Sequence, residues 1–364
     1  MRIGILTGGG DVPGLNACLR SVVLNACAAG HEVIGLKRGW KGVVEAALAE
    51  DPFRAGHAVR LGRAEVRGID RRGGTILHTS RFDPTRDTGD HTQAILALFE
   101  RLSLSALIVV GGDGSLRSAV HFHRLGVPVI AIPKTMDNDV FGTDYAIGFS
   151  TAVSRSVAAI NALRTTVASH ERVAIVELFG RRSGETALLA GFLAQVDRTA
   201  IAEVPVDAGR LFSLLAEDRA TSPEGYAVLV VSEGARLSGQ AEPADLDLSA
   251  SARAQAGIGR QIARAFEAAT GIGTIVQELA YLMRAGEPDA LDRMVGFAFG
   301  ALAVQLVNEG RFGRLVALLD GNYATSEIGV IMEGARRVDV TRLYDAAAYR
   351  PRIDRVEGLP MLIY

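Results

Sequence analysis

Cysteine, proline and tryptophan are scarce in this chain, and neither sign of charge is in excess. The 364 residues include 2 Cys, 11 Pro and 1 Trp, and 39 Lys and Arg stand against 41 Asp and Glu, for a formal net charge of −2. This balance lacks the basic excess typical of DNA- and RNA-binding proteins, so no nucleic-acid partner is expected. Glycine is abundant at 41 residues. Without a Gly-X-Y repeat, that abundance predicts turns and excludes collagen.

The two cysteines and the lack of long apolar runs indicate a protein of the cytoplasm. Cys18 and Cys27 fall in one predicted helix, which keeps their side chains apart, so free thiols in a reducing compartment are expected. After Met1 and Arg2, the first apolar run is too short for a signal peptide. No run reaches the roughly 18 apolar residues that a membrane span requires, so no membrane partner is expected.

Short apolar runs alternate along the chain with longer segments of helical period, and glycine-rich joints separate them. This pattern is typical of βαβ units around a mainly parallel sheet, so an α/β fold is expected. At 364 residues the chain favours two lobes, with a boundary near Gly148. Residues 234–256 are small and polar and predict an exposed loop of weak order. The predicted strands are 3–7, 32–37, 106–110, 127–132, 172–178 and 226–232.

The first glycine-rich joint is Thr7-Gly8-Gly9-Gly10-Asp11-Val12-Pro13-Gly14, between an apolar run and a helix. Backbone without side chains can approach a phosphate at such a place and offer its N–H groups. A plain tight turn is an equally good interpretation of three glycines alone. The joint matches neither G-x-G-x-x-G nor the Walker pattern, which disfavours dinucleotide binding and P-loop hydrolysis.

The second joint is Gly111-Gly112-Asp113-Gly114-Ser115, directly after a very apolar strand. In an open α/β sheet, ligands bind at the carboxyl ends of the strands, and a carboxylate flanked by glycines there suits a hydrated Mg²⁺ on a polyphosphate. The alternative is an Asx turn formed by Asp113. Ser115 is expected to cap the helix that follows.

The third joint is Pro133-Lys134-Thr135-Met136-Asp137-Asn138-Asp139. In an extended segment, the i, i+2 spacing of Asp137 and Asp139 puts both carboxylates on one side. Like charges that close need a cation or a proton between them, so one carboxylate suits a general base and the other suits metal placement. A solvated acidic turn is the alternative for this joint taken alone.

Together the three joints resemble the phosphofructokinase family. The hallmark segments of that family stand here as GGDVPGLN, GGDGS and PKTMDND, followed by GTDYAIGFSTA, and the resemblance runs from Ile3 to about Glu233 before it becomes patchy. It implies two Rossmann-like three-layer α/β lobes with mainly parallel sheets and an active site in the cleft between them. Residues 1–148 plus about 283–334 would form the phosphate-donor lobe. Residues 149–282 plus about 335–364 would form the sugar-phosphate lobe.

The resemblance also implies a role for each matching residue. Asp137 is the expected general base on the 1-hydroxyl of the sugar, and Thr135 is expected to hydrogen-bond the transferring phosphoryl group. Asp113 and Asp139 are the expected Mg²⁺ residues, with Asp139 also supporting the base. The other expected catalytic and donor-binding residues are Arg181, Gly9, Trp40, Arg81, Phe82, Arg86, Gly112, Gly114, Ser115 and Lys134. The expected sugar-phosphate residues are Thr135, Asp137, Arg172, Phe179, Gly180, Arg181, Glu233, Tyr281 and Arg284.

Two positions bear on the phosphate donor. In the family that the chain resembles, an Asp in place of Gly114 narrows the space for the α-phosphate of a nucleotide and accompanies pyrophosphate use. Gly114 leaves that space open. Lys134 accompanies pyrophosphate users but also a group of ATP users, and its ammonium can pair with the terminal phosphate of either donor. The combination favours ATP, with pyrophosphate as the alternative.

The acceptor site departs from the family pattern. Arg172 matches an arginine that grips the sugar 6-phosphate, in some cases across a subunit boundary, and Arg284 and Tyr281 are retained in the later segment. The second cross-subunit arginine falls at Ile275, however, and one lost charge-assisted phosphate contact costs about 1.5–3 kcal/mol. Weak binding of fructose 6-phosphate, compensation by Arg182 and a different sugar phosphate are the three interpretations.

The resemblance therefore implies a cytoplasmic, Mg²⁺-dependent 6-phosphofructokinase of glycolysis. It would transfer a phosphoryl group from ATP to fructose 6-phosphate, give fructose 1,6-bisphosphate, and form a homo-oligomer, either a dimer or a tetramer. The alternatives are the same reaction with pyrophosphate, another sugar phosphate as acceptor, and a sugar-phosphate sensor without turnover.

Overall fold

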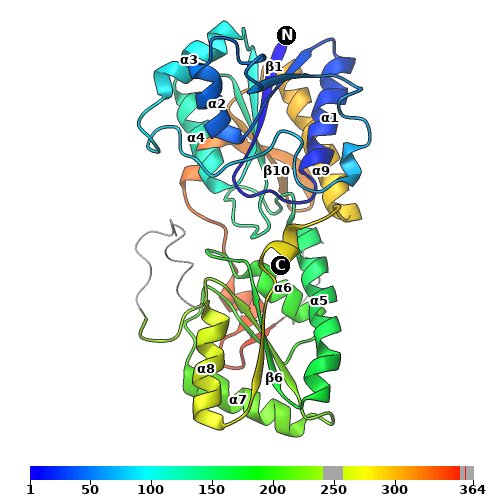
Figure 1. Cartoon of the computed structure of the whole chain (residues 1–364), viewed down its shortest axis with the longest axis vertical. Helices are drawn as coiled ribbons and strands as arrows, with labels where there is room; N and C mark the ends of the chain where they lie inside the picture. The colour runs from blue at the N-terminus through cyan, green and yellow to red at the C-terminus, as the bar shows by residue number, and fades with distance from the viewer. Residues whose placement is uncertain (241–256, 353–356, 358–364) are drawn as a thin grey trace. The chain divides into compact units, whose positions relative to one another are not determined.

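The computed structural model of the chain describes residues 1–240, 257–352 and 357 (Figure 1). The chain divides into two compact units. The first consists of Met1–Thr151 and Arg284–Ala335, and the second contains the described residues between 152 and 283 and from 336 onward. Most of the predicted loop 234–256 lies outside the described residues.

The first unit is built on a seven-stranded sheet with the strand order β11-β10-β5-β4-β1-β2-β3. Its inner strands are mutually parallel, whereas the edge strands β3 and β11 run antiparallel to their neighbours. The strands are β1 (Arg2–Gly8), β2 (Glu32–Leu36), β3 (Ala58–Leu61), β4 (Ala106–Gly111), β5 (Val129–Pro133), β10 (Arg314–Leu319) and β11 (Asn322–Glu327).

Helices cover both faces of this sheet, so the first unit has three layers (Figure 1). One face carries α2 (Gly39–Leu48), α3 (Thr92–Arg101) and α4 (Asp113–Arg124), whose apolar side chains join those of the strands in one buried cluster. The other face carries α1 (Leu15–Ala28) and α9 (Ala290–Asn308). Short 3₁₀ helices lie at Ile69–Arg71 (η1) and Ile328–Met332 (η4). Because β4 and β5 are buried along their whole length, they read as continuous apolar runs in the sequence.

Helix α9 packs closely on α1 because two glycines of α9 lie at the contact. A Cβ on Gly296 would lie 3.0 Å from the carbonyl oxygen of Gly14, and one on Gly300 would lie 2.7 Å from that of Cys18. Among the described residues, α9 is the one helix long and apolar enough to cross a membrane, and half of its apolar window is buried within the fold. A core helix of this length passes the same test, so the feature is weak evidence for a span.

The second unit has a four-stranded parallel sheet with the order β7-β8-β6-β9. Its strands are β6 (Val173–Leu178), β7 (Arg198–Ala200), β8 (Ala227–Ser232) and β9 (Thr274–Glu278), and a small hairpin joins β12 (Tyr344–Asp345) to β13 (Arg350–Pro351). Helices α7 (Ala208–Thr221) and α8 (Ile258–Thr270) share a buried apolar cluster with β6 and β8. The other helices are α5 (Phe149–Ser169), α6 (Glu185–Leu193), η3 (Ala280–Arg284) and α10 (Val340–Leu343).

The predicted α/β class and the mainly parallel sheets are confirmed, and each predicted strand is present within two residues of its expected ends. The cysteines are free thiols, as expected. One local prediction is wrong: Ser115 does not cap α4, because that helix begins at Asp113 with Gly112 in the N-cap position. The polar edge strand β11 was missed because Asn-Tyr-Ala-Thr-Ser-Glu contains no apolar run.

Candidate active site

The three joints that follow β1, β4 and β5 meet at one edge of the first unit's sheet. Gly8, at the end of β1, pairs in register with Gly111 of β4, and Gly111 pairs with Pro133 of β5. The strands are parallel, so the residues that follow each of them emerge at the same edge. The structure therefore brings together the segments that the sequence predicted to carry phosphate and metal chemistry.

Glycine is required at the first two strand ends because Ser115 occupies the space above them. A Cβ on Gly8 would lie 2.3 Å from Ser115 Oγ, and one on Gly111 would lie 2.6 Å from Ser115 Cβ. Ser115 is itself buried, with 8% of its surface exposed. The serine therefore wedges α4 against the strand ends and is not an open ligand contact in this structure.

Trp40 does not present its ring at the site. Its side chain is 1% exposed, stacks on Phe122 with ring centroids 4.9 Å apart, and donates from Nε1 to the carbonyl oxygen of Ser115 at 3.0 Å. The expectation that its ring lies beside the nucleotide is therefore corrected: Trp40 is a core residue that supports the first turn of α4.

At Gly9 the lack of a side chain matters more than the backbone N–H group. Its N–H donates to the carbonyl of Ser80 at 2.9 Å, and its own carbonyl accepts from the Thr79 hydroxyl at 2.7 Å. This amide is thus occupied, which departs from the expectation that the joint offers bare N–H groups. A Cβ on Gly9 would lie 3.2 Å from Nζ of Lys134, and the φ of +83° also favours glycine.

Lys134 lies at the centre of the joined segments. It is 2% exposed, and its Nζ donates to the carbonyl of Gly10 at 2.6 Å. Burial is the main cause that lowers the pKa of the Lys134 ammonium to about 8, and the nearby charges of Arg284 and Arg81 lower it further, against the opposing effect of Asp139 and Asp11. Three cationic side chains therefore gather where three strands end, an arrangement that favours binding of a polyanion.

Arg284 belongs to this donor-side group in the structure. A Cβ on Gly10 would lie 2.3 Å from one terminal nitrogen of Arg284, and Nε of Arg284 lies 3.7 Å from Asp11. The sequence placed Arg284 among the sugar-phosphate residues. Its guanidinium lies on the glycine-rich turn of the first unit, where the absence of a side chain at position 10 makes room for it, and its role toward the sugar phosphate stays a prediction.

The segment after β5, residues 133–139, is named here the reactive loop. Along it, burial alternates: Thr135, Asp137 and Asp139 are half-buried, whereas Met136 and Asn138 are 8% and 1% exposed. The alternation puts the hydroxyl and the two carboxylates on the more open side of the loop, as the i, i+2 spacing predicted. The Thr135 hydroxyl also accepts from the backbone N–H of Asp137 at 3.2 Å.

Asp113 stands in the first turn of α4 and is paired with Arg117. Nε of Arg117 donates to both carboxylate oxygens at 2.9 Å, and the Asp113 side chain is 14% exposed. Within residues 1–240, 257–352 and 357, no group of three His, Cys, Asp or Glu side chains forms a metal cage. Mg²⁺ is ordinarily held by one or two carboxylates together with substrate phosphates, so hard oxygen donors on Asp113 and Asp139 fit that mode of binding.

The predicted nucleotide segment contributes side chains of different exposure. Arg81 is exposed, and its terminal nitrogen would lie 3.6 Å from a Cβ on Gly10. Phe82 is half-buried against the core cluster of the first unit, 6.5 Å from the ring of His91. Arg86 is 82% exposed and pairs with Asp83 at 2.8 Å. Arg81 therefore lies at the strand ends, whereas Phe82 and Arg86 lie further along this surface loop.

Gly112 and Gly114 differ in the room around them. A Cβ on Gly112 would lie 3.3 Å from the carbonyl oxygen of Lys134, whereas a Cβ on Gly114 would meet nothing within 4 Å. Gly114 is also exposed. A side chain at position 114 would therefore meet no other residue, and the use of this space by a nucleotide stays a prediction.

In the second unit, the residues that follow β6 contact the residues that follow β8. The Glu233 N–H donates to the carbonyl of Leu178 at 2.8 Å, and Nε of Arg181 donates to Glu233 at 2.8 Å. Gly180 has a φ of +138°, and a Cβ there would lie 2.6 Å from the Ser232 hydroxyl. The predicted sugar-binding residues Gly180, Arg181 and Glu233 are thus neighbours, and the carboxylate holds the guanidinium in place.

Phe179 and Tyr281 are also neighbours. Their rings make an edge-on contact with centroids 6.0 Å apart, and the Tyr281 side chain is 58% exposed. Arg172 lies elsewhere: it precedes the first residue of β6, at the opposite end of the strand from Phe179, and a strand of six residues spans roughly 20 Å. A single chain therefore does not bring Arg172 to the turn that holds Arg181 and Glu233.

One buried carboxylate, Asp292, was not predicted from the sequence; it contacts residues 145–151, which in turn contact the reactive loop. Asp292 is 0% exposed in the first turn of α9 and accepts from the Tyr145 hydroxyl at 2.7 Å and from the Thr151 hydroxyl at 2.5 Å. Burial raises the pKa of Asp292 to about 6, against the lowering effect of its hydrogen bonds. The only signal in the sequence is Asp289, three residues earlier, which caps α9.

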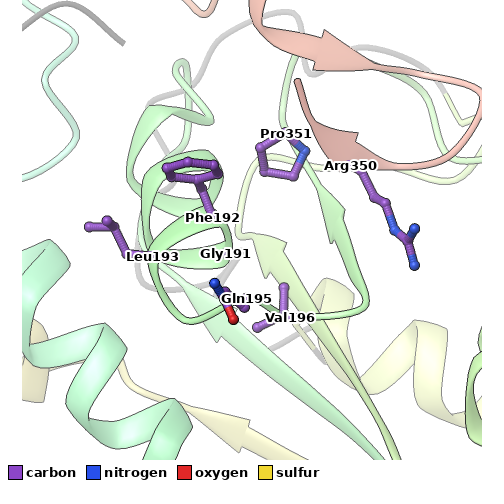
Figure 2. Close-up of a pocket in the computed structure, with 7 residues that line it drawn as sticks. All are labelled: Gly191, Phe192, Leu193, Gln195, Val196, Arg350 and Pro351. Carbon is purple, nitrogen blue, oxygen red and sulfur yellow. The ribbon is translucent and has the colours of Figure 1, made fainter. Parts of the chain in front are cut away.

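A cavity of about 300 Å³ lies in the second unit between the end of α6 and β13, lined in part by Phe192, Val196 and Pro351 (Figure 2). None of the predicted site residues lines it. The volume of this cavity therefore says nothing about the reaction, whereas the strand ends of the first unit carry the relevant chemistry.

The family model described as phosphofructokinase matches residues 2–307. The chain is 39% identical over 325 residues to the ATP-dependent 6-phosphofructokinase of Chloroflexus aggregans, covering 87% of each chain. It is 38% identical over 343 residues to the pyrophosphate–fructose 6-phosphate 1-phosphotransferase of Dictyoglomus thermophilum, covering 93% of this chain and 95% of the relative. The crystal structure of a pyrophosphate-dependent phosphofructokinase from Nitrosospira multiformis is 18% identical, with a TM-score of 0.78 over 100% of this chain and 95% of that chain, which supports the fold alone.

Proposed function

Because this chain belongs to the phosphofructokinase family, we propose that it transfers the terminal phosphoryl group of ATP to the 1-hydroxyl of fructose 6-phosphate. The observation that carries the proposal is the open side of the reactive loop, which Thr135, Asp137 and Asp139 share, with the charge of Asp139 acting on the Lys134 ammonium. Phosphoryl transfer requires positioning and cations, with no covalent nucleophile from the protein.

Each residue has a defined task in this reaction. Asp137 accepts the proton of the sugar 1-hydroxyl as the oxygen attacks phosphorus, and Thr135 donates a hydrogen bond to the moving phosphoryl group. Lys134, Arg81 and Arg284 balance the charge of the donor phosphates. Mg²⁺, the general cofactor of this family, supplies further charge neutralisation, and Asp113 and Asp139 are the residues that would hold it.

The acceptor residues lie in the second unit. Arg181 and Glu233, held together at 2.8 Å, suit the sugar hydroxyls, and Phe179 and Gly180 shape the same turn. Arg172 stands at the far end of β6, so its contact with a sugar 6-phosphate comes from a second copy of the chain. We therefore extend the proposal to a cytoplasmic homo-oligomer, a dimer or tetramer, with small-molecule substrates.

Pyrophosphate is the second candidate donor. Lys134 suits the terminal phosphate of either donor, and one of the similar proteins is named for pyrophosphate. The open space at Gly114 favours ATP, because the α-phosphate of a nucleotide needs room that pyrophosphate does not. ATP therefore requires open space at position 114, whereas pyrophosphate does not.

The test is to incubate the purified protein and Mg²⁺ with a panel of sugar phosphates and either ATP or pyrophosphate, and to identify products by phosphorus NMR. Fructose 1,6-bisphosphate from ATP is expected. Asp137→Asn should lower kcat by about 10²–10⁴-fold, the usual contribution of a general base, with the melting temperature retained. No product from any pair would contradict the proposed enzyme, and product from pyrophosphate alone would reverse the choice of donor.

A further inference from the structure

Asp292 gathers hydrogen-bond donors from one short segment of the chain. Its Oδ1 accepts from the Tyr145 hydroxyl and from the Gly148 N–H, both at 2.7 Å. Its Oδ2 accepts from the N–H of Thr151 at 2.8 Å and from the Thr151 hydroxyl at 2.5 Å. Residues 145–151, named here the strap, are therefore held by a single buried carboxylate.

The strap also forms hydrogen bonds with the reactive loop. The Ile147 N–H donates to the carbonyl of Pro133 at 3.1 Å, and the Thr135 N–H donates to the carbonyl of Ile147 at 3.1 Å. The Ala146 N–H also donates to Asn138 Oδ1 at 2.8 Å. Both ends of the reactive loop are thus hydrogen-bonded to the strap, and Asp137 lies between the bonded residues.

The glycine-rich turn after β1 packs on the same strap. A Cβ on Gly148 would lie 2.5 Å from Cβ of Val12, and a Cβ on Gly14 would lie 2.5 Å from Cγ2 of Ile147 and 3.5 Å from Cβ of Asp292. Both glycines have φ near +100°. The donor-side turn and the reactive loop are therefore placed relative to one another through residues that Asp292 holds.

We propose that Asp292 is a positioning residue for phosphoryl transfer, which sets the place of Thr135 and Asp137 through the strap without touching substrate. The inference rests on the proposed function for the roles of those two residues. Because near-attack geometry is sensitive to shifts of about 1 Å, a loosened strap lowers the rate by up to about 10²-fold while the binding residues stay in place.

The chemistry of this site requires a carboxylate. The backbone N–H groups of Gly148 and Thr151 can only donate, and each meets a different oxygen of Asp292. In an Asp292→Asn variant, either orientation of the amide turns its NH₂ group against one of those N–H groups. One buried donor then loses its partner, and the strap must shift to satisfy it.

The test compares kcat and KM of the natural protein, Asp292→Asn and Tyr145→Phe. Asp292→Asn should lower kcat by about 10–100-fold with KM for both substrates within about threefold, and Tyr145→Phe should lower kcat less, since it removes one of four donors. Tyr145→Phe also keeps the proposal testable if Asp292→Asn does not fold, because an unchanged kcat in that variant would then overturn it.

The control is Leu98→Ala, which removes a buried side chain of the first unit's core on α3, away from the strap. It should lower the melting temperature without lowering kcat at a temperature where it is folded. A kcat in Asp292→Asn within about twofold of the natural protein, or an equal loss in Leu98→Ala, would refute the positioning role.

Hydrogen exchange separates this inference from the proposed reaction, because it needs no substrate. In Asp292→Asn, the amides of Thr135 and Ile147 should exchange faster than in the natural protein, with amides of β6 unchanged as an internal reference. Unchanged exchange at both amides would contradict the inference even in an active enzyme. If the natural protein makes no product but exchange rises as expected, the strap is confirmed and the proposed function fails.

Discussion

The surroundings of Lys134 change the chemistry of its ammonium group. Its ammonium is buried against the Gly10 carbonyl, and burial together with Arg284 and Arg81 lowers its pKa to about 8. A bound polyphosphate adds negative charge beside it and raises the pKa again, so binding is strongest where the free protein still holds the proton. The affinity for a donor therefore falls as pH rises through about 8.

Replacement of this lysine makes the expectation measurable. Lys134→Met keeps an unbranched side chain, one atom shorter, but removes the charge, and it should weaken binding of a non-hydrolysable ATP analogue by about 10–100-fold at pH 7. The variant should lose the decline in affinity above pH 8 that the natural protein shows. Titration calorimetry between pH 7 and pH 9 checks both effects, and parallel pH profiles for the two proteins would contradict them.

Helix α4 presents Gly114 to open space in its first turn. A Cβ there meets nothing within 4 Å, so Gly114→Asp is expected to fold normally while its carboxylate occupies the region of the nucleotide α-phosphate. kcat/KM for ATP should fall by about tenfold or more, the effect of a like-charge contact of roughly 1.4 kcal/mol, with turnover of pyrophosphate spared. Steady-state kinetics with both donors tests the prediction. Gly114→Asn, uncharged and of equal size, separates charge from bulk.

Gly126, just after α4, and Gly148, just before α5, form a matched pair for testing the strap. Gly148 and Gly126 have φ of +103° and +92°, but a Cβ at 148 would lie 2.5 Å from Val12 whereas one at 126 meets nothing within 4 Å. Gly126→Ala should lower the free energy of unfolding by about 1–2 kcal/mol, the cost of left-handed backbone. Gly148→Ala should lower it by about 2–5 kcal/mol, since the cost of overpacking is added. Urea unfolding measures both, and equal losses would show that the Val12 contact costs nothing.

At the scale of the whole molecule, the proposed site needs residues from two copies of the chain. Arg172→Ala and Asp137→Asn are each expected to be nearly inactive with fructose 6-phosphate. If Arg172 serves a neighbouring copy, unfolding and refolding the two variants together creates sites with both natural residues. Random pairing in a two-fold dimer restores about a quarter of the sites. Kinetics of the mixture, with sedimentation to establish the oligomer, tests this. Activity no higher than that of the separate variants would place Arg172 outside a shared site.

Much of the fold could be predicted because burial leaves a local pattern. Strands such as β4 and β5 are enclosed on both faces, so their whole length is apolar. The exposed edge strand β11 leaves no such pattern. The alternation along the reactive loop was also predictable, since Thr135, Asp137 and Asp139 share one side through spacing alone.

The departures at the site have a common physical origin in contacts between distant residues. Trp40 was predicted to lie beside the nucleotide, but its ring is stacked in the core on Phe122. Arg284 lies within the predicted sugar-phosphate segment, and its contact with Gly10, far away in the sequence, was not predicted. Asp292 lies in an apolar helix whose periodicity gives no reason to expect a carboxylate with four donors.

The order of residues alone was enough to establish the α/β class, the places where strands end and the acidic loop after β5, because hydrophobic periodicity and glycine spacing act between near neighbours in the chain. Which cations surround Lys134, and which carboxylate holds the strap, became known only from the folded chain. Charges and hydrogen bonds act between side chains that are close in space, and residues more than a hundred positions apart carry no record of that closeness in a local pattern.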